Sequence, residues 1–435
     1  MTIDRRTFLK ASTIAAAATA TGAKAMLPAE QAAWDKWNGE KVPRPDGILA
    51  SEPMLQCPAP DSMGVAFTVN GISAGFAEVA DNPEMENATR FEPSGFPVTR
   101  TDARIHQIRM TGLKPGTRYW YRVGAAALTH PVGYWTKKSE IVWSGVYSFV
   151  TAGENAPSRF AMICDTHAEF TQMERITAKR RSLGIPFVVW NGDVAQSRFK
   201  SLDEIIAHFV ELPKNADYAT DAPIIFNPGN HDYRGDWAHH MDEVVMTRPS
   251  RERTGNFALL RRNFAFRIGE IALIGLDTGE DKPDRHPSYD GLAKFSLYRE
   301  LQAKWLKEQF KREEIASAPY IVAFAHIPLF DKRPGANPGN ILEDYASWQQ
   351  DCANLWGPTL AKNGVQLVLA GHTHRYRFDP ATEQRPWAQL VGGGRGDKTY
   401  QTLVDCRVEG GELVADVWNT DKDELIATHK FAPRA

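Results

Sequence analysis

After residue 158 the chain alternates short apolar runs with longer amphipathic segments. The apolar runs are rich in Val, Ile and Phe and too short for helices, which predicts buried β-strands. The longer segments carry apolar side chains at helical spacing along one face. Strands that alternate with helices are typical of an α/β fold, so we predict an α/β domain over residues 158–435. Its predicted strands are 160–164, 187–190, 224–226, 320–325 and 365–370, and its predicted helices are 170–183, 201–211 and 298–310.

Residues 46–153 have a different pattern, in which strand-like segments are separated by turn residues. Residues 65–69 form one predicted strand. After a Pro-Gly turn, Tyr119, Tyr121 and Val123 alternate onto one face of another strand. This segment resembles the tyrosine corner of fibronectin type III domains. We therefore predict an all-β, fibronectin III-like sandwich for this part of the chain.

The first 25 residues have the composition of a signal peptide, with a charged start, a short Ala- and Thr-rich middle and small residues at the end. The pair Arg5-Arg6, followed by Phe-Leu-Lys, resembles the twin-arginine signal of bacteria. That resemblance implies an exported protein, periplasmic or secreted, with the twin-arginine translocase as a partner during export. A helix with a chance arginine pair is the alternative. We interpret residues 26–45 as a linker or a surface arm.

The composition of the chain limits the kinds of partner that we expect it to bind. The formal charge of −2 offers no basic surface for nucleic acid, so we expect no nucleic-acid partner. No apolar run approaches the ~20 residues that span a bilayer, so we expect no stable membrane span. The four cysteines lack CxxC spacing, which argues against a zinc ribbon or a disulfide scaffold, although one disulfide stays open. They are Cys57, Cys164, Cys352 and Cys406.

Five short polar blocks carry the chemistry of this chain, and each begins where an apolar run stops. In α/β sheets the carboxyl ends of the strands form the binding edge, so we expect the blocks to meet in space. Imidazole, carboxylate and amide ligands suit Zn, Mn or Fe rather than Ca. A bridging carboxylate can hold two such ions ~3.5–4 Å apart. The blocks are Asp165-Thr166-His167, Gly192-Asp193, Gly229-Asn230-His231-Asp232, Ala325-His326 and Gly371-His372-Thr373-His374.

The order of the blocks resembles the calcineurin-like metallophosphoesterase superfamily, whose signature runs DxH, GD, GNH(D/E), H and GHxH. The resemblance covers residues 158–378 and implies a four-layer αββα sandwich. It also implies two divalent metal ions, with Mn, Fe or Zn favoured. By this resemblance the first metal is bound by Asp165, His167 and His374, the second by Asn230, His326 and His372, and both by Asp193 as the bridge.

The same resemblance assigns the catalytic residues. A metal-bound hydroxide would attack phosphorus in line, and His231 would stabilise the transition state or protonate the leaving oxygen. Asp232 would orient His231 through a carboxylate–imidazole pair. The remaining histidines, among them His106, are expected to be packed or surface residues. The Gly-rich stretch at 392–396 is expected to be a tight turn behind the site, although it could cradle phosphate.

A β-sandwich before the catalytic domain resembles the purple acid phosphatases and their bacterial relatives. Two positions depart from the purple enzymes. Where this chain has His167, those enzymes have Gly, and where it has Gln196, they have a Tyr that binds iron. We therefore expect no tyrosinate–iron band and no purple colour.

The expected activity is hydrolysis of a small phosphoester, with a phosphomonoesterase favoured. A phosphodiesterase with the same site is the alternative, and a cell-wall or partner-binding protein that acts through the β-sandwich is the alternative of another class. Arg234, Arg375 and Arg395 are candidate phosphate clamps.

Overall fold

The computed structural model describes residues 26–93, 95, 97–211, 217–249, 255–331, 346–394 and 399–434. The predicted signal peptide over 1–25 and the candidate clamp Arg395 lie outside the described residues. Within the described part, we find no helix that is both long and apolar enough to cross a membrane. The four cysteines are all buried and free.

A nine-stranded sheet runs through the molecule, in the order β21-β20-β19-β10-β11-β12-β1-β2-β5. Its four central strands, β10, β11, β12 and β1, are parallel, and the strands that follow at either side are antiparallel. The strands are β1 (Met54–Ala59), β2 (Ser62–Thr68), β5 (Ile105–Thr111), β10 (Arg159–Ile163), β11 (Val188–Trp190), β12 (Ile224–Phe226), β19 (Thr402–Glu409), β20 (Glu412–Asn419) and β21 (Glu424–Phe431).

A second, six-stranded sheet has the order β13-β14-β15-β16-β18-β17, and its four central strands are parallel. Aromatic and aliphatic side chains from both sheets, such as Phe160, Phe187 and Phe324, form one buried cluster, so the two sheets are stacked. The strands are β13 (Phe264–Ile268), β14 (Ile271–Leu276), β15 (Tyr320–Ala325), β16 (Leu367–Ala370), β17 (Arg377–Asp379) and β18 (Ala388–Val391).

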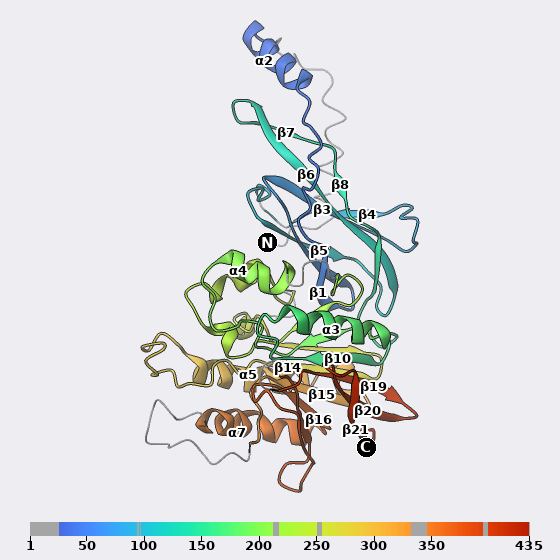
Figure 1. Cartoon of the computed structure of the whole chain (residues 1–435), viewed down its shortest axis with the longest axis vertical. Helices are drawn as coiled ribbons and strands as arrows, with labels where there is room; N and C mark the ends of the chain where they lie inside the picture. Colours follow the sequence, from blue (N-terminus) through green and yellow to red (C-terminus); the bar gives the residue numbers. More distant parts are fainter. Residues whose placement is uncertain are drawn as a thin grey trace.

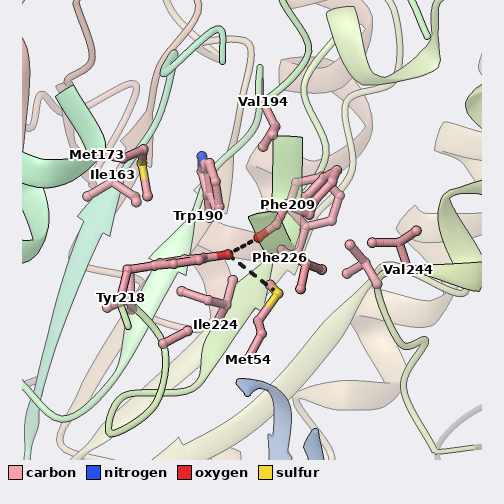
Figure 2. Close-up of a cluster of buried hydrophobic side chains, with 14 of the residues drawn as sticks. Met54, Ile163, Met173, Trp190, Val194, Phe209, Tyr218, Ile224, Phe226 and Val244 are labelled. Atoms are coloured by element: carbon pink, nitrogen blue, oxygen red, sulfur yellow. Dashed lines mark hydrogen bonds between the residues drawn. The ribbon is translucent and has the colours of Figure 1, made fainter. Parts of the chain in front are cut away.

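Helices cover the outer face of each sheet (Figure 1). Figure 2 shows the core beneath the first set, where Trp190 packs near Phe209 and Tyr218, and the Tyr218 hydroxyl donates to the Phe209 carbonyl. The four-layer α/β architecture is confirmed. The first set is α3 (Phe170–Ser182), α4 (Leu202–Ile206) and the π-helix η2 (Ala207–Glu211); the second is α5 (Phe295–Gln309), α6 (Glu313–Ala316) and α7 (Ala346–Lys362). Short 3-10 turns are η3 (His231–Tyr233), η4 (Ala238–Glu243) and η6 (Gly255–Phe257).

Helix α5 begins three residues before the predicted start at 298. The carboxylate of Asp284 accepts hydrogen bonds from the backbone N–H groups of Phe295 and Ser296, at 2.7 and 3.3 Å. The first N–H groups of a helix have no partner within the helix, so this carboxylate stabilises an extra turn. The cap comes from a residue eleven positions away, outside the window that helical periodicity samples.

The N-terminal part is a β-sandwich whose core lies between β1, β2 and β5 on one side and β3, β6 and β9 on the other. At its corner the Tyr119 hydroxyl accepts a hydrogen bond from the backbone N–H of Lys114, at 3.0 Å. Because β1 pairs with β12, the sandwich shares a sheet with the α/β part. Its other strands are β3 (Ser73–Ala80), β4 (Thr89–Phe91), β6 (Arg118–Val132), β7 (Trp135–Lys138), β8 (Val142–Trp143) and β9 (Tyr147–Val150).

Within the segment interpreted as a linker or arm, residues Pro28–Gly39 form helix α2. It lies at the end of the molecule far from the α/β layers (Figure 1). Trp34 contacts Trp37 and Trp135, with ring centroids 5.0 and 6.4 Å apart, so the helix packs on the β6–β7 hairpin.

Candidate dimetal site

All five polar blocks lie at the carboxyl ends of parallel strands. Three follow β10, β11 and β12 of the nine-stranded sheet, and two follow β15 and β16 of the six-stranded sheet. Stacking places these strand ends at one edge, which brings all seven predicted metal ligands together. They are Asp165, His167, Asp193, Asn230, His326, His372 and His374.

The first group consists of Asp165, His167, Asp193 and His374, whose ligand atoms lie within 4.8 Å of one another. The Nε2 atoms of His167 and His374 are 2.9 Å apart. His374 Nε2 lies 3.5 Å from an oxygen of Asp165, and His167 Nε2 lies 3.9 Å from an oxygen of Asp193. The four side chains therefore surround one point.

The second group consists of Asp193, His326 and His372, again within 4.8 Å. His326 Nε2 lies 3.3 Å from the same oxygen of Asp193. The amide oxygen of Asn230 lies 2.9 Å from Nδ1 of His372 and adds a fourth candidate ligand. Asp193 is the residue common to both groups, which is the position that a bridging carboxylate must have.

The hydrogen bonds of two histidines show that this cluster is suited to cations. Nδ1 of His326 lies 2.7 Å from the Asn191 carbonyl, and Nδ1 of His167 lies 3.1 Å from the Ala195 carbonyl. A carbonyl only accepts, so each Nδ1 carries a proton, and in the neutral ring that a metal ion binds, Nε2 would offer its lone pair. Nε2 of His326 is buried and has no hydrogen-bond partner in the described part of the chain. A divalent ion would satisfy this lone pair.

The charges of the site lead to the same conclusion. Burial raises the pKa of Asp165, and the adjacent Asp193 carboxylate raises it further. Burial also acts to raise the pKa of Asp193, but the imidazoles of His326, His231 and His167 hold it well below its usual range. Two buried carboxylates side by side require positive charge between them, and divalent ions supply it.

Backbone strain is concentrated at these ligands. Of the eleven described non-glycine residues with positive φ, five are predicted metal ligands. Side chains disfavour this left-handed region, at a cost on the order of 1–3 kcal/mol each, and such strain gathers at functional sites. The five residues are Asp165, His167, Asp193, His372 and His374.

Of the Gly-rich stretch at 392–396, which is predicted to be a tight turn, the structure describes residues 392–394, and Gly393 packs against Asp165. Its φ is +85°, and a Cβ there would lie 2.1 Å from an oxygen of Asp165. Its N–H donates to the Thr402 hydroxyl at 2.7 Å, so this N–H is engaged and is not available to a phosphate. Only glycine fits at this position.

The predicted pair between Asp232 and His231 is wrong. The Asp232 carboxylate accepts four backbone N–H bonds of 2.8–3.0 Å, and in the described residues none joins it to the His231 ring. A buried carboxylate among unpaired N–H groups is best satisfied by them, so Asp232 ties together the loops after β11 and β12. The donors are Asp193, Val194, Ala195 and Gly229.

His231 lies in the site with other partners. Its Nδ1 is 3.0 Å from the Gln196 carbonyl, and its Nε2 is 2.9 Å from Nη1 of Arg234 and 4.0 Å from an oxygen of Asp193. Burial lowers its pKa to about 4. The side chain of Gln196 is exposed.

A sixth strand-end segment, after β14, also supports the site. It was not predicted from the sequence. Asp277 accepts a hydrogen bond from the Tyr233 hydroxyl, and Thr278 accepts one from the backbone of Ile327, at 3.3 Å. Glu280 pairs with Arg234. The rule that identified the other blocks applies here too, because Asp277 directly follows an apolar strand.

Comparison with known proteins agrees with this geometry. The family described as Calcineurin-like phosphoesterase matches residues 158–376, and the one described as Purple acid Phosphatase, N-terminal domain matches residues 52–151. Purple acid phosphatase 15 of Arabidopsis thaliana is 22% identical over 303 residues, 63% of this chain and 49% of that protein. The chain thus spans about half the length of this relative.

Two solved structures share the fold at 13% identity. PhoD has a TM-score of 0.61, over 91% of this chain and 94% of that one. Purple acid phosphatase PPD1 from yellow lupin seeds has a TM-score of 0.60, over 88% and 75%. Because each alignment covers 88% or more of this chain, both extend across the N-terminal sandwich and the α/β layers. The chain belongs to the calcineurin-like phosphoesterase family, in the branch that carries a purple acid phosphatase N-terminal domain.

Proposed function

We propose that this chain is an exported hydrolase of small phosphoesters that uses two divalent metal ions and prefers monoesters to diesters. The observation that carries the proposal is the shared carboxylate of Asp193 between two groups of ligands. Bound there, two divalent ions would activate water and neutralise the phosphoryl oxygens. The preference for monoesters is supported by the family of the N-terminal domain and by the absence of a basic overall charge.

The protein's own residues have separate tasks in this proposal. The ligands hold the ions, and His231, with Nε2 facing the site, stabilises the transition state or protonates the leaving oxygen. Asp232 keeps the loops of Asp193 and Asn230 in place. Export to the periplasm or medium rests on residues 1–25 alone, with the twin-arginine translocase as partner.

Metal analysis combined with hydrolysis of p-nitrophenyl phosphate and bis(p-nitrophenyl) phosphate tests the proposal. We expect two metal ions per chain, faster cleavage of the monoester and no tyrosinate–iron absorption band. Asp193→Ala should lose both metal and activity, whereas Asp405→Asn, at a buried carboxylate away from the site, should keep both.

Faster cleavage of the diester would mean that the chain is a phosphodiesterase and not a phosphatase. Full activity in Asp193→Ala, or metal binding with no hydrolysis of either ester, would refute the enzymatic proposal and leave the sandwich as the functional part.

A further inference from the structure

Arg234 lies beside the site, but most of the N–H groups of its guanidinium already have hydrogen-bond partners. Its Nε and Nη2 form a bidentate pair with Glu280, both at 2.8 Å, and Nη2 also contacts Asp281 at 3.2 Å. Its Nη1 lies 2.9 Å from Nε2 of His231. Four of the five N–H groups of this guanidinium thus have partners, which leaves little for a substrate phosphate.

The partner of Arg234 is itself fixed. Glu280 is fully buried, and its carboxylate also accepts from the Tyr289 hydroxyl at 2.7 Å. The guanidinium of Arg299 holds the Glu280 backbone carbonyl at 2.7 Å. Moving Arg234 toward a substrate would break a buried bidentate pair, so the predicted role of Arg234 as a phosphate clamp does not fit this geometry.

The contact with His231 determines where the ring proton lies. A guanidinium only donates hydrogen bonds, so Nε2 of His231 must accept. In the neutral ring the proton then lies on Nδ1, which donates to the Gln196 carbonyl at 3.0 Å. Both ring nitrogens are thereby assigned, and Nε2 is the nitrogen that faces Asp193, 4.0 Å from its carboxylate.

We propose that Arg234, anchored by Glu280, is a positioning residue that fixes the orientation and tautomer of the His231 ring. This inference rests on the proposed function for its catalytic consequence. Nε2 of the neutral ring carries no proton and accepts from Arg234, so His231 could protonate a leaving oxygen only after Nε2 takes up a proton in place of this contact, and Arg234 fixes where that nitrogen lies. It replaces Asp232 in the task of orienting His231. Arg234 acts through His231 and does not contact the substrate.

A double-mutant cycle tests the catalytic part. Arg234→Ala should lower kcat by about 10- to 100-fold, as removal of supporting partners commonly does. In a His231→Gln background the same substitution should cost nothing more, because the ring it positions is gone. An equal loss in both backgrounds would overturn the proposal, since Arg234 would then act independently of His231.

Arg159→Ala is the matched control. Arg159 makes a bidentate pair with Asp405 at 2.9 and 2.7 Å, and its side chain is 27% exposed, against 25% for Arg234. We expect it to leave kcat unchanged. A loss as large as that of Arg234→Ala would mean that breaking any such pair damages the enzyme, and would overturn the proposal.

NMR of ¹⁵N-histidine-labelled, metal-free protein tests the structural part without activity. The His231 signals are those lost in His231→Gln. We expect a protonated Nδ1 and an unprotonated Nε2, and a mixture of tautomers in Arg234→Ala. A protonated Nε2 in the neutral wild-type ring would refute the proposal. If the metal-loaded enzyme hydrolyses no phosphoester, the proposed function fails, while this measurement still decides the role of Arg234.

Discussion

The two stacked-sheet regions of this chain each bury a histidine, with opposite surroundings. His106 of the N-terminal sandwich contacts Ser73 at 2.9 Å and packs against the ring of Phe67. Nε2 of His326, in the α/β part, faces the carboxylate of Asp193 at 3.3 Å and makes no hydrogen bond within the described residues. Burial lowers the pKa of His106 to about 4. For His326 burial also acts to lower the pKa, but Asp193 outweighs it and raises the pKa to about 10.

The difference shows what separates a packed histidine from a candidate ligand. Both residues are buried and both follow or lie within β-strands, so burial and sequence context alone do not distinguish them. The distinction lies in the charge that each ring faces, because only His326 lies beside a buried carboxylate. The ring of His106 in the sandwich is neutral and serves for packing. The ring of His326 at a strand end faces buried negative charge, which requires a cation.

Metal removal should have the largest effect and should separate the two regions. Exhaustive chelation is expected to lower kcat/KM by about 10³-fold or more, because several kcal/mol of charge stabilisation are lost. Hydrogen exchange should rise in the strained strand-end loops and stay unchanged in the sandwich. Re-addition of metal is the control. Equal rises in both regions would contradict the comparison.

Replacing each histidine by Gln tests the comparison directly. His326→Gln should lower metal content and reduce kcat/KM by about 10²-fold or more, since one ligand of the second group is lost. His106→Gln should leave kcat/KM unchanged and lower the free energy of unfolding by about 1–2 kcal/mol through imperfect packing. Metal analysis, kinetics and denaturant unfolding on both variants measure this. A metal loss in His106→Gln would break the distinction.

Asp232→Asn should destabilise the α/β part by about 2–3 kcal/mol. The amide has one acceptor oxygen and an NH₂ group that faces backbone N–H donors, so buried donors lose their partner. Denaturant unfolding measures the change, and Asp421→Asn, at a partly exposed carboxylate, is the control. If Asp232→Asn proved as stable as this control, the loop-anchoring role would be wrong.

The last predicted effect is a pH dependence of stability from His106. Its pKa is about 4 in the folded protein, against an ordinary 6.5 when unfolded. Between these values the unfolded chain binds a proton that the folded chain does not, so stability should fall as pH falls from 6.5 to about 4. The slope is at most about 1.4 kcal/mol per pH unit and vanishes above and below this window. His106→Gln should remove it; identical pH profiles would refute the assignment.

Much of the fold follows from local pattern, and the exceptions have identifiable causes. The strands 224–226 and 320–325 occur as predicted, because short apolar runs between polar residues have few other ways to be buried. The start of α5 was placed too late because its cap is the distant Asp284. The pairing of β1 with β12 joins segments far apart in sequence, which no local pattern contains.

The sequence by itself determined which residues can be ligands and that they stand at strand ends, because a parallel sheet brings such ends to one edge. Only the tertiary structure decided which partner each side chain meets. Asp232 is next to His231 in sequence yet turns to backbone N–H groups, and His231 instead meets Arg234, which is held by Glu280 from another strand end. Such choices depend on which loops pack together, and that is decided by the stacking of the two sheets.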